Sequence, residues 1–210
     1  TFFQSYNISF TEPWLGGRKP NGLTVSGYYS QQTNGALKKI TNSDGNRIDN
    51  PNRQALGIYG ASIGLSRRLQ WPDDFFTLYT EVSYQYYQLQ NWINFVFNDG
   101  TANNLSFRVV FARNSIDAPI YPTSGSQTSL SLQFTPPYSL FDDKDKNYQD
   151  LSPQERYKFV EFHKWKFNSS WFTPLAGKLV LNTKIGYGFL GSYNSDVGQS
   201  PFERFFLGGD

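Results

Sequence analysis

Side chains capable of covalent catalysis are not arranged in a recognisable site in this sequence of 210 residues, although serine, threonine and lysine are plentiful. It contains no cysteine and a single histidine, His163, so the chain offers neither a thiolate nucleophile nor a second histidine. No Gly-x-Ser-x-Gly turn is present, and no glycine-rich phosphate loop follows a strand and opens a helix. We therefore expect no enzymatic activity and no bound cofactor, and we interpret His163 as a histidine on the surface of a strand.

Acidic residues provide two weak candidates for a metal site. Asp142, Asp143 and Asp145 could together bind calcium, but a solvated loop is the favoured interpretation. The stretch 42–46 has the residue types of a calcium-binding loop at the wrong spacing, with its glycine too early, and is typical of a tight turn. We therefore expect no metal site.

A third candidate group consists of charged residues that alternate with apolar ones in sequence. In a barrel, the face that carries them would line a wet lumen, where they could tune the passage of ions. The alternative is that they are ordinary polar side chains that fill a hydrated interior. The residues of this group are Glu81, Arg108, Lys164, Lys166 and Lys184.

The composition restricts the class of protein further. The net charge of +2, from 19 Lys and Arg and 17 Asp and Glu, gives no general surface for binding nucleic acid. Aromatic residues make up 18% of the chain, whereas all hydrophobic residues together make up 38% and the mean hydropathy is −0.53. No stretch approaches the roughly 18 consecutive apolar residues of a transmembrane helix, which excludes a helical membrane protein. A membrane β-barrel remains open, because its strands alternate.

The elements that would position these side chains follow a period of two residues. From Thr128 to Phe134, apolar residues alternate with Ser129, Ser131 and Gln133, as in a strand with one dry face. Gly, Thr and Tyr fill the interiors of such segments, and apolar residues do not recur at helical spacing. We therefore expect eight antiparallel strands and no helix. The other seven segments are residues 6–10, 23–29, 61–65, 78–86, 105–111, 165–171 and 178–189.

The connections between these segments alternate in length. Four are short, at residues 13–21, 70–74, 116–124 and 174–177, and four are long, at residues 33–55, 91–103, 136–156 and from 192 onward. Up-and-down barrels of the bacterial outer membrane have short periplasmic turns and long outer loops. The pattern predicts an all-β, antiparallel, up-and-down transmembrane barrel. Because the chain begins and ends abruptly, we interpret residues 1–210 as one partial barrel domain of a larger protein.

Three stretches of the sequence resemble the BamA family of outer-membrane protein assembly factors. They are residues 7–14, residues 113–126 and residues 201–209, and their order, spacing and predicted sides together make the resemblance specific. The family belongs to a superfamily that includes TamA, the two-partner secretion transporters and the organellar Sam and Toc channels. The resemblance covers the whole chain.

The resemblance implies roles for particular residues. Two periplasmic turns would include Glu12, Pro13, Trp14, Asp117, Tyr121, Pro122, Thr123 and Gly125. The stem of a long loop that folds back into the lumen would include Pro201, Phe202, Phe205, Phe206, Gly208, Gly209 and Asp210.

The resemblance also implies that the chain is about half of a barrel. Its eight strands would be the fourth to eleventh of about sixteen. The first and last strands, whose weak seam forms a lateral gate, would lie outside residues 1–210, as would the POTRA domains and the Arg-Gly-Phe loop tip.

The function implied by the resemblance is that of the core subunit of the outer-membrane β-barrel assembly machinery. Its partners would be membrane lipids, nascent outer-membrane proteins and accessory lipoproteins, and the long outer loops could bind surface-exposed partners. No nucleic acid is expected. Two alternatives stay open: a passive or substrate-specific channel, and a two-partner secretion or TamA-type translocation barrel.

Overall fold

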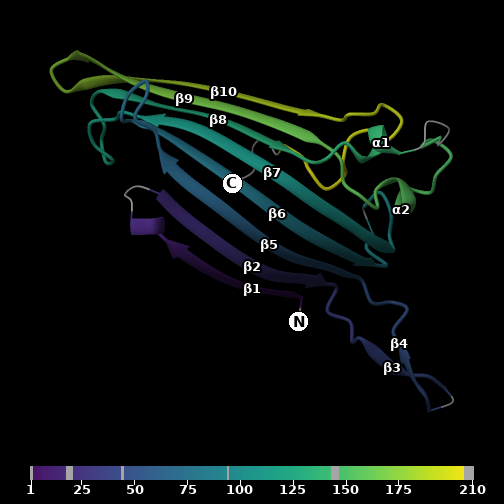
Figure 1. Cartoon of the computed structure of the whole chain (residues 1–210). Helices are drawn as coiled ribbons and strands as arrows, with labels where there is room; N and C mark the ends of the chain where they lie inside the picture. The colour runs from purple at the N-terminus through teal and green to yellow at the C-terminus, as the bar shows by residue number, and fades with distance from the viewer. Residues whose placement is uncertain (1, 18–20, 44, 94, 143–146, 206–210) are drawn as a thin grey trace.

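The computed structural model describes residues 2–17, 21–43, 45–93, 95–142 and 147–205. These residues form one curved antiparallel sheet of eight long strands, in the order β1-β2-β5-β6-β7-β8-β9-β10 (Figure 1). The expectation of an all-β, antiparallel part-barrel is confirmed, and within the described residues the sheet is open. The strands are β1 (Phe3–Glu12), β2 (Asn21–Thr33), β5 (Ala55–Arg68), β6 (Phe76–Gln90), β7 (Gly100–Asn114), β8 (Gly125–Phe134), β9 (His163–Ala176) and β10 (Leu179–Gly191).

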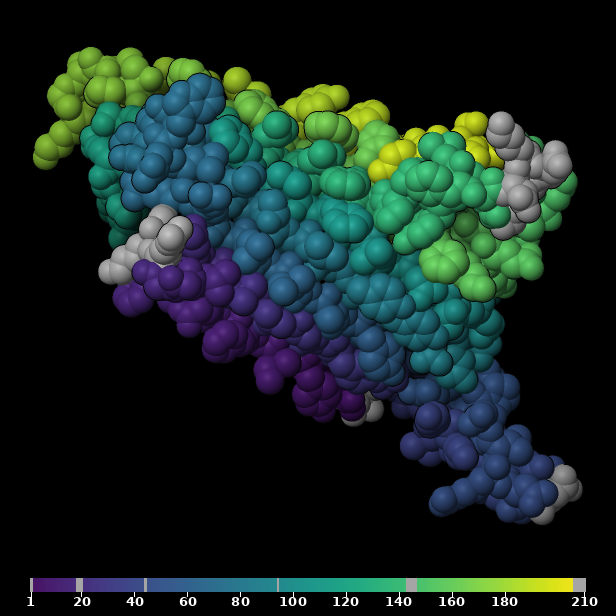
Figure 2. Space-filling view, in the orientation of Figure 1, coloured from purple at the N-terminus to yellow at the C-terminus, as the bar shows by residue number. Residues whose placement is uncertain are grey.

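Short elements in the loops correct the expectation of eight strands and no helix. A hairpin of β3 (Lys39–Thr41) and β4 (Arg47–Asp49) stands away from the sheet (Figure 2), and its tight turn is closed by a bond from the Asn42 N–H to the Asn46 carbonyl at 2.9 Å. Two helices, α1 (Tyr138–Phe141) and α2 (Pro153–Arg156), and a 3₁₀ turn at Leu15–Gly17 complete the fold. Such short elements carry too few residues for a periodic pattern to predict them. No helix among the described residues is long and apolar enough to cross a membrane.

Short and long connections alternate less regularly along the chain than expected. Residues 91–99, between β6 and β7, are no longer than residues 115–124, between β7 and β8, because both strands extend beyond their alternating segments. Residues 34–54 and 135–162 are long, as expected. We call the end of the sheet with these two connections the loop end, and the opposite end, with residues 115–124, the turn end (Figure 1).

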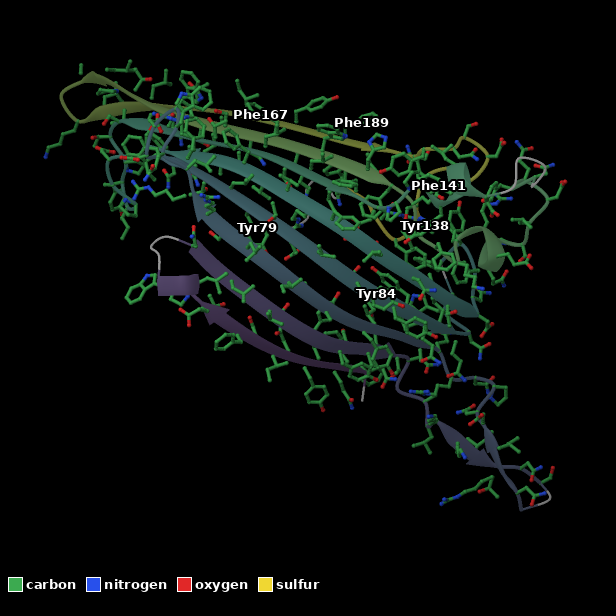
Figure 3. All side chains as sticks on the ribbon, in the orientation of Figure 1. Tyr79, Tyr84, Tyr138, Phe141, Phe167 and Phe189 are labelled. Atoms are coloured by element: carbon green, nitrogen blue, oxygen red, sulfur yellow. The ribbon has the colours of Figure 1, made fainter. Side chains whose placement is uncertain are left out.

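The register gives the sheet two different faces. Val25, Ile63, Val82 and Phe107 are successive partners across four strands, and they lie on an outer face whose large apolar side chains remain exposed. Because side chains alternate along a strand, the neighbouring residues form a polar inner face. Side chains stand on both faces in Figure 3, where Phe167 and Phe189 mark β9 and β10.

Tyrosines form a row on the outer face near the loop end. Tyr6, Tyr29, Tyr59 and Tyr86 are register partners across four strands, and their ring centroids are 6.4, 4.7 and 6.2 Å apart in that order. Amphipathic rings are enriched where a membrane meets water. The row is therefore suited to one surface of a bilayer.

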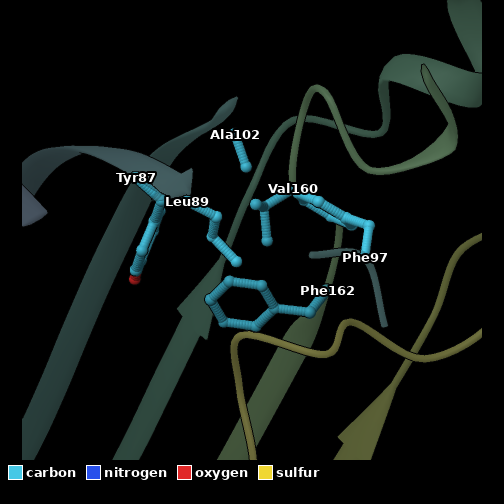
Figure 4. Packing of buried hydrophobic residues seen from close by; sticks show 6 residues of the cluster. All are labelled: Tyr87, Leu89, Phe97, Ala102, Val160 and Phe162. Atoms are coloured by element: carbon cyan, nitrogen blue, oxygen red, sulfur yellow. The ribbon is translucent and has the colours of Figure 1, made fainter. Parts of the chain in front are cut away.

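The fully buried apolar residues gather on the inner face at the loop end. Phe162 and Val160, which precede β9, have no exposed surface and pack with residues of β6, β7 and the 91–99 loop (Figure 4). Two backbone bonds of 2.8 Å hold the connection between β8 and β9 against β7. They run from the Val160 N–H to the Asn103 carbonyl and from the Asn103 N–H to the Lys158 carbonyl. The loops thus share one core with the sheet. The other members of this core are Tyr87, Leu89, Phe97 and Ala102.

Replacing Phe162 by Ala tests how far this core holds the loops to the sheet. We expect the Phe162→Ala variant to lose about 3 kcal/mol or more of unfolding free energy, because a fully buried ring leaves a cavity. The Phe141→Ala control removes a ring that is 80% exposed and should change stability by less than about 0.5 kcal/mol. Urea unfolding of the protein refolded into lipid vesicles measures both, and equal effects would contradict the buried role of Phe162.

Candidate functional site

The candidate site is the polar inner face of β6 to β10 together with the chain that follows β10. After Gly191 the chain reverses direction in a turn that Gly198 closes, with a positive φ of 78° and an N–H bond of 3.1 Å to the Asn194 carbonyl. Residues 199–205 then run back along β10 over the inner face, and we call them the inward segment. They and Leu190 line a cleft of about 430 Å³ that also contacts Val96.

Phe202 attaches the inward segment to the buried core at the loop end. Its ring centroid lies 4.5 Å from that of Tyr87, 4.9 Å from that of Phe95 and 6.1 Å from that of Phe97. Pro201 beside it is buried. Because aromatic contacts of this geometry add to the burial of apolar surface, the segment is firmly seated at this end.

Glu203 pairs with a lysine of the wall. The Lys164 ammonium donates to a Glu203 carboxylate oxygen at 2.9 Å and to the Arg204 carbonyl at 3.0 Å. The two side chains are only 10% and 16% exposed, so water screens this pair far less than it would a pair on an open surface.

Phe205 rests on a place where the wall has no side chain. A Cβ atom built on Gly188 would come within 2.8 Å of the Phe205 ring, so only glycine allows this close approach. The ammonium groups of Lys164 and Lys166 lie 4.9 and 5.6 Å from the centroid of the same ring, within the range of a cation–π interaction.

The five charged residues expected to face a lumen all lie on the inner face by register. Glu81 is opposite Arg108, with 3.9 Å between the guanidinium and the carboxylate, and it also accepts a bond of 2.6 Å from the Tyr79 hydroxyl. Lys164 and Lys166 contact the inward segment, and Lys184 lies farther toward the turn end. Whether these charges tune ion passage stays a prediction.

A row of serines crosses the inner face beside the charged residues. Ser9, Ser26, Ser62, Ser83 and Ser106 are successive register partners on β1, β2, β5, β6 and β7. The hydroxyl oxygens of Ser26 and Ser62 lie 2.8 Å apart, as do those of Ser83 and Ser106. Small hydroxyl side chains therefore bond the strands to one another through side chains as well as through the backbone.

The turn residues implied by the resemblance lie at the turn end, far along the strands from the inward segment. Glu12 accepts a bond of 3.1 Å from the Trp14 N–H across Pro13, and Trp14 is exposed. The structure therefore brings together the charged wall and the inward segment but does not bring the turns to them.

Asp117 organises the second of these turns. Its carboxylate accepts bonds from the N–H groups of Thr123 at 2.9 Å and Ser124 at 3.1 Å, and from the Thr123 hydroxyl. These bonds, led by that of the hydroxyl, lower the pKa of Asp117 to about 2. Gly125 ends the turn with a φ of 100°, a conformation that disfavours any other residue.

Between these anchoring residues, the turn displays apolar side chains. Ile120 is 75% exposed and Tyr121 is 89% exposed, and Pro122 follows them. Tyr121 has a positive φ of 55°, which is strained for a bulky residue. The network of Asp117 is what holds the backbone in this shape.

Some residues of the site, among them Glu203, were not among the predicted residues. Glu203 lies within the predicted stretch 201–209, and Lys164 was predicted to face the lumen, but only the fold shows that the two form a pair. Gly186 and Gly188, in the interior of an alternating segment, were a usable signal, because glycine in a strand often marks a close approach of other atoms. The predicted residues Phe206, Gly208, Gly209 and Asp210 lie outside the described residues, as do Asp143 and Asp145.

The remaining candidates for chemistry have structural partners. His163 lies at the start of β9, where its Nδ1 accepts a bond of 3.1 Å from the Trp165 indole. Asp142 accepts a bond of 2.9 Å from the Tyr148 hydroxyl. In the described part of the chain, no three His, Cys, Asp or Glu side chains are grouped so that they could hold a metal ion.

Replacing Asp117 by Asn should destabilise the protein in a manner that depends on pH. A carboxylate whose pKa falls from about 3.9 in the unfolded chain to about 2 contributes stability above pH 4 and loses it as the pH falls toward 2. The urea midpoint of Asp117→Asn should therefore lie below that of the parent protein at neutral pH, and the two should converge in acid. Asp49→Asn, in the separate hairpin, is the control, and a difference that does not depend on pH would contradict this role of Asp117.

Comparison with known proteins identifies the family. A family model described as the Omp85 superfamily domain matches residues 1–210. The crystal structure of BamA from Haemophilus ducreyi lacking POTRA domains 1–3 is similar, with a TM-score of 0.63 and 18% sequence identity over 95% of this chain, which spans 35% of that chain. No curated protein matches the sequence. At this identity the likeness to BamA concerns the fold alone, whereas the family model matches every residue, and the chain therefore belongs to the Omp85 superfamily.

Proposed function

We propose that this chain is part of an outer-membrane assembly factor of the BamA type, which folds and inserts other β-barrel proteins. The observation that carries the proposal is the inward segment, which is seated on the charged inner wall by Phe202, Glu203 and Phe205. Membership of the Omp85 superfamily supports the same conclusion, because that superfamily includes assembly and translocation barrels.

The proposed activity is physical and needs no covalent step. Backbone N–H and C=O groups cannot stay unpaired in hydrocarbon, so a nascent barrel strand needs a hydrogen-bonding edge as it enters the bilayer. A barrel that opens along one seam can supply that edge by strand addition and can thin the bilayer beside it. We propose no catalytic residue and no cofactor for this chain.

In this scheme the eight strands form the stable wall opposite the seam. The exposed apolar outer face contacts lipid in the bacterial outer membrane, the loop end faces outward, and the turn end faces the periplasm. There the Asp117 turn would present Ile120 and Tyr121 to POTRA domains or accessory lipoproteins. The partners of the complete protein would be nascent outer-membrane proteins, and the long loops could bind surface-exposed proteins.

The proposal is tested by detaching the inward segment in the complete protein. In a strain that depends on the variant, replacing both Phe202 and Phe205 by Ala should lower the amount of folded porin in the outer membrane, because the segment loses its two ring contacts. The Leu175→Ala and Leu179→Ala double variant is the control, since it removes two exposed apolar side chains at the turn end. Porin levels are measured by heat-modifiable migration on gels.

The same experiment separates the alternatives. Porin at the level of the parent strain, with the variant itself present and folded, would contradict the assembly function. Loss of one secreted protein without loss of porins would instead indicate a two-partner secretion transporter. A change in permeability to small solutes alone would indicate a passive channel.

A further inference from the structure

We propose that Lys164 is a positioning residue, which with Glu203 forms a latch that holds the inward segment against the wall. The role of this latch in barrel assembly rests on the proposed function, but the latch itself is a property of the chain alone.

The charge of the wall requires a partner from outside the sheet. Of the five charged side chains predicted to face the lumen, four are cations and only Glu81 is an anion, and Glu81 is already engaged by Arg108 and the Tyr79 hydroxyl. Lys164 is nearly buried, and a buried ammonium without a partner is strongly unfavourable. Glu203 is the anion that the inward segment brings to it.

The contacts of Lys164 also fix the direction of the segment. Its ammonium group bonds the Glu203 side chain and the next residue's backbone carbonyl at the same time, and it lies against the ring of Phe205. Lys164 is the register partner of Leu190, whereas Gly188, under Phe205, is the partner of Lys166. Between Glu203 and Phe205 the segment therefore advances by two residues of β10 toward the turn end, into the interior.

The other cations of the wall do not have this geometry. Lys166 lies 5.6 Å from the centroid of the Phe205 ring, and Lys184 lies four residues beyond Gly188 toward the turn end. The Phe205 ring fits over Gly188 only while Glu203 is held beside Lys164, two register positions away. In this scheme the ion pair sets the position of the inward segment along β10, and the contact between Phe205 and Gly188 follows from it.

The latch is tested by reversing its charges in the complete protein. The natural sequence of this chain has no cysteine, so a single Ser200→Cys substitution reports on docking, because Ser200 is 5% exposed while the segment is seated. In a background free of other cysteines, labelling of this thiol by a polar maleimide should be at least about tenfold faster with Lys164→Glu or Glu203→Lys, since either change leaves a buried charge unpaired. The double variant Lys164→Glu with Glu203→Lys restores the ion pair but not the bond to the Arg204 carbonyl, so it should label more slowly than either single variant.

Further variants separate the latch from general loss of folding. Lys164→Arg should retain slow labelling, Lys164→Gln should label faster, and Lys178→Glu, in the exposed turn between β9 and β10, is the matched control. Heat-modifiable migration checks that each barrel is folded. Slow labelling in both single charge reversals, or a folded double variant that labels as fast as either of them, would overturn the latch.

The readout of barrel assembly is independent of the labelling. If the labelling follows the expected pattern and folded porin falls in the single variants and recovers in the double variant, both proposals stand. If the labelling follows the pattern while porin levels never change, the latch stands and the assembly function fails.

Discussion

The continuous ladder of backbone hydrogen bonds from β1 to β10 is the constraint on which the rest of this molecule depends. Because each of the eight long strands pairs with the next long strand in sequence, one register runs across the sheet and decides which side chains share a face. A slip of one residue would exchange Val25, Ile63 and Val82 with the serines beside them. The outer surface, the charged wall and the seat of the inward segment are all consequences of that register.

The long strands could be predicted from the sequence because alternation is a local property. Residues 128–134 and 178–189 show it without reference to the rest of the chain; the first lies within β8 and the second, apart from Lys178, lies within β10. The hairpin of β3 and β4 and the four-residue helices could not be predicted this way, because each is too short to show a period; of the two helices, only α2 has a capping box, between Ser152 and Glu155.

The site could be predicted in part. Alternation placed Lys164 on the polar face and the resemblance singled out Phe202 and Phe205, but the two groups are separated by a long stretch of chain. That Glu203 meets Lys164 depends on the turn at Gly198, which reverses the chain after β10. This contact joins residues that are distant in sequence, so it depends on the path of the chain in space and cannot be predicted from composition or from the spacing of nearby residues.

The serine row has a mechanical consequence. Hydroxyl bonds such as those between Ser26 and Ser62 and between Ser83 and Ser106 lie across the direction in which neighbouring strands would slide, so the row resists shear within the sheet. Where such a bond joins two strands, those strands slide less against each other when a load is applied to the sheet. In a closed barrel, strain would then concentrate at whichever junction between strands lacks such cross-links, and that junction would be the first to part.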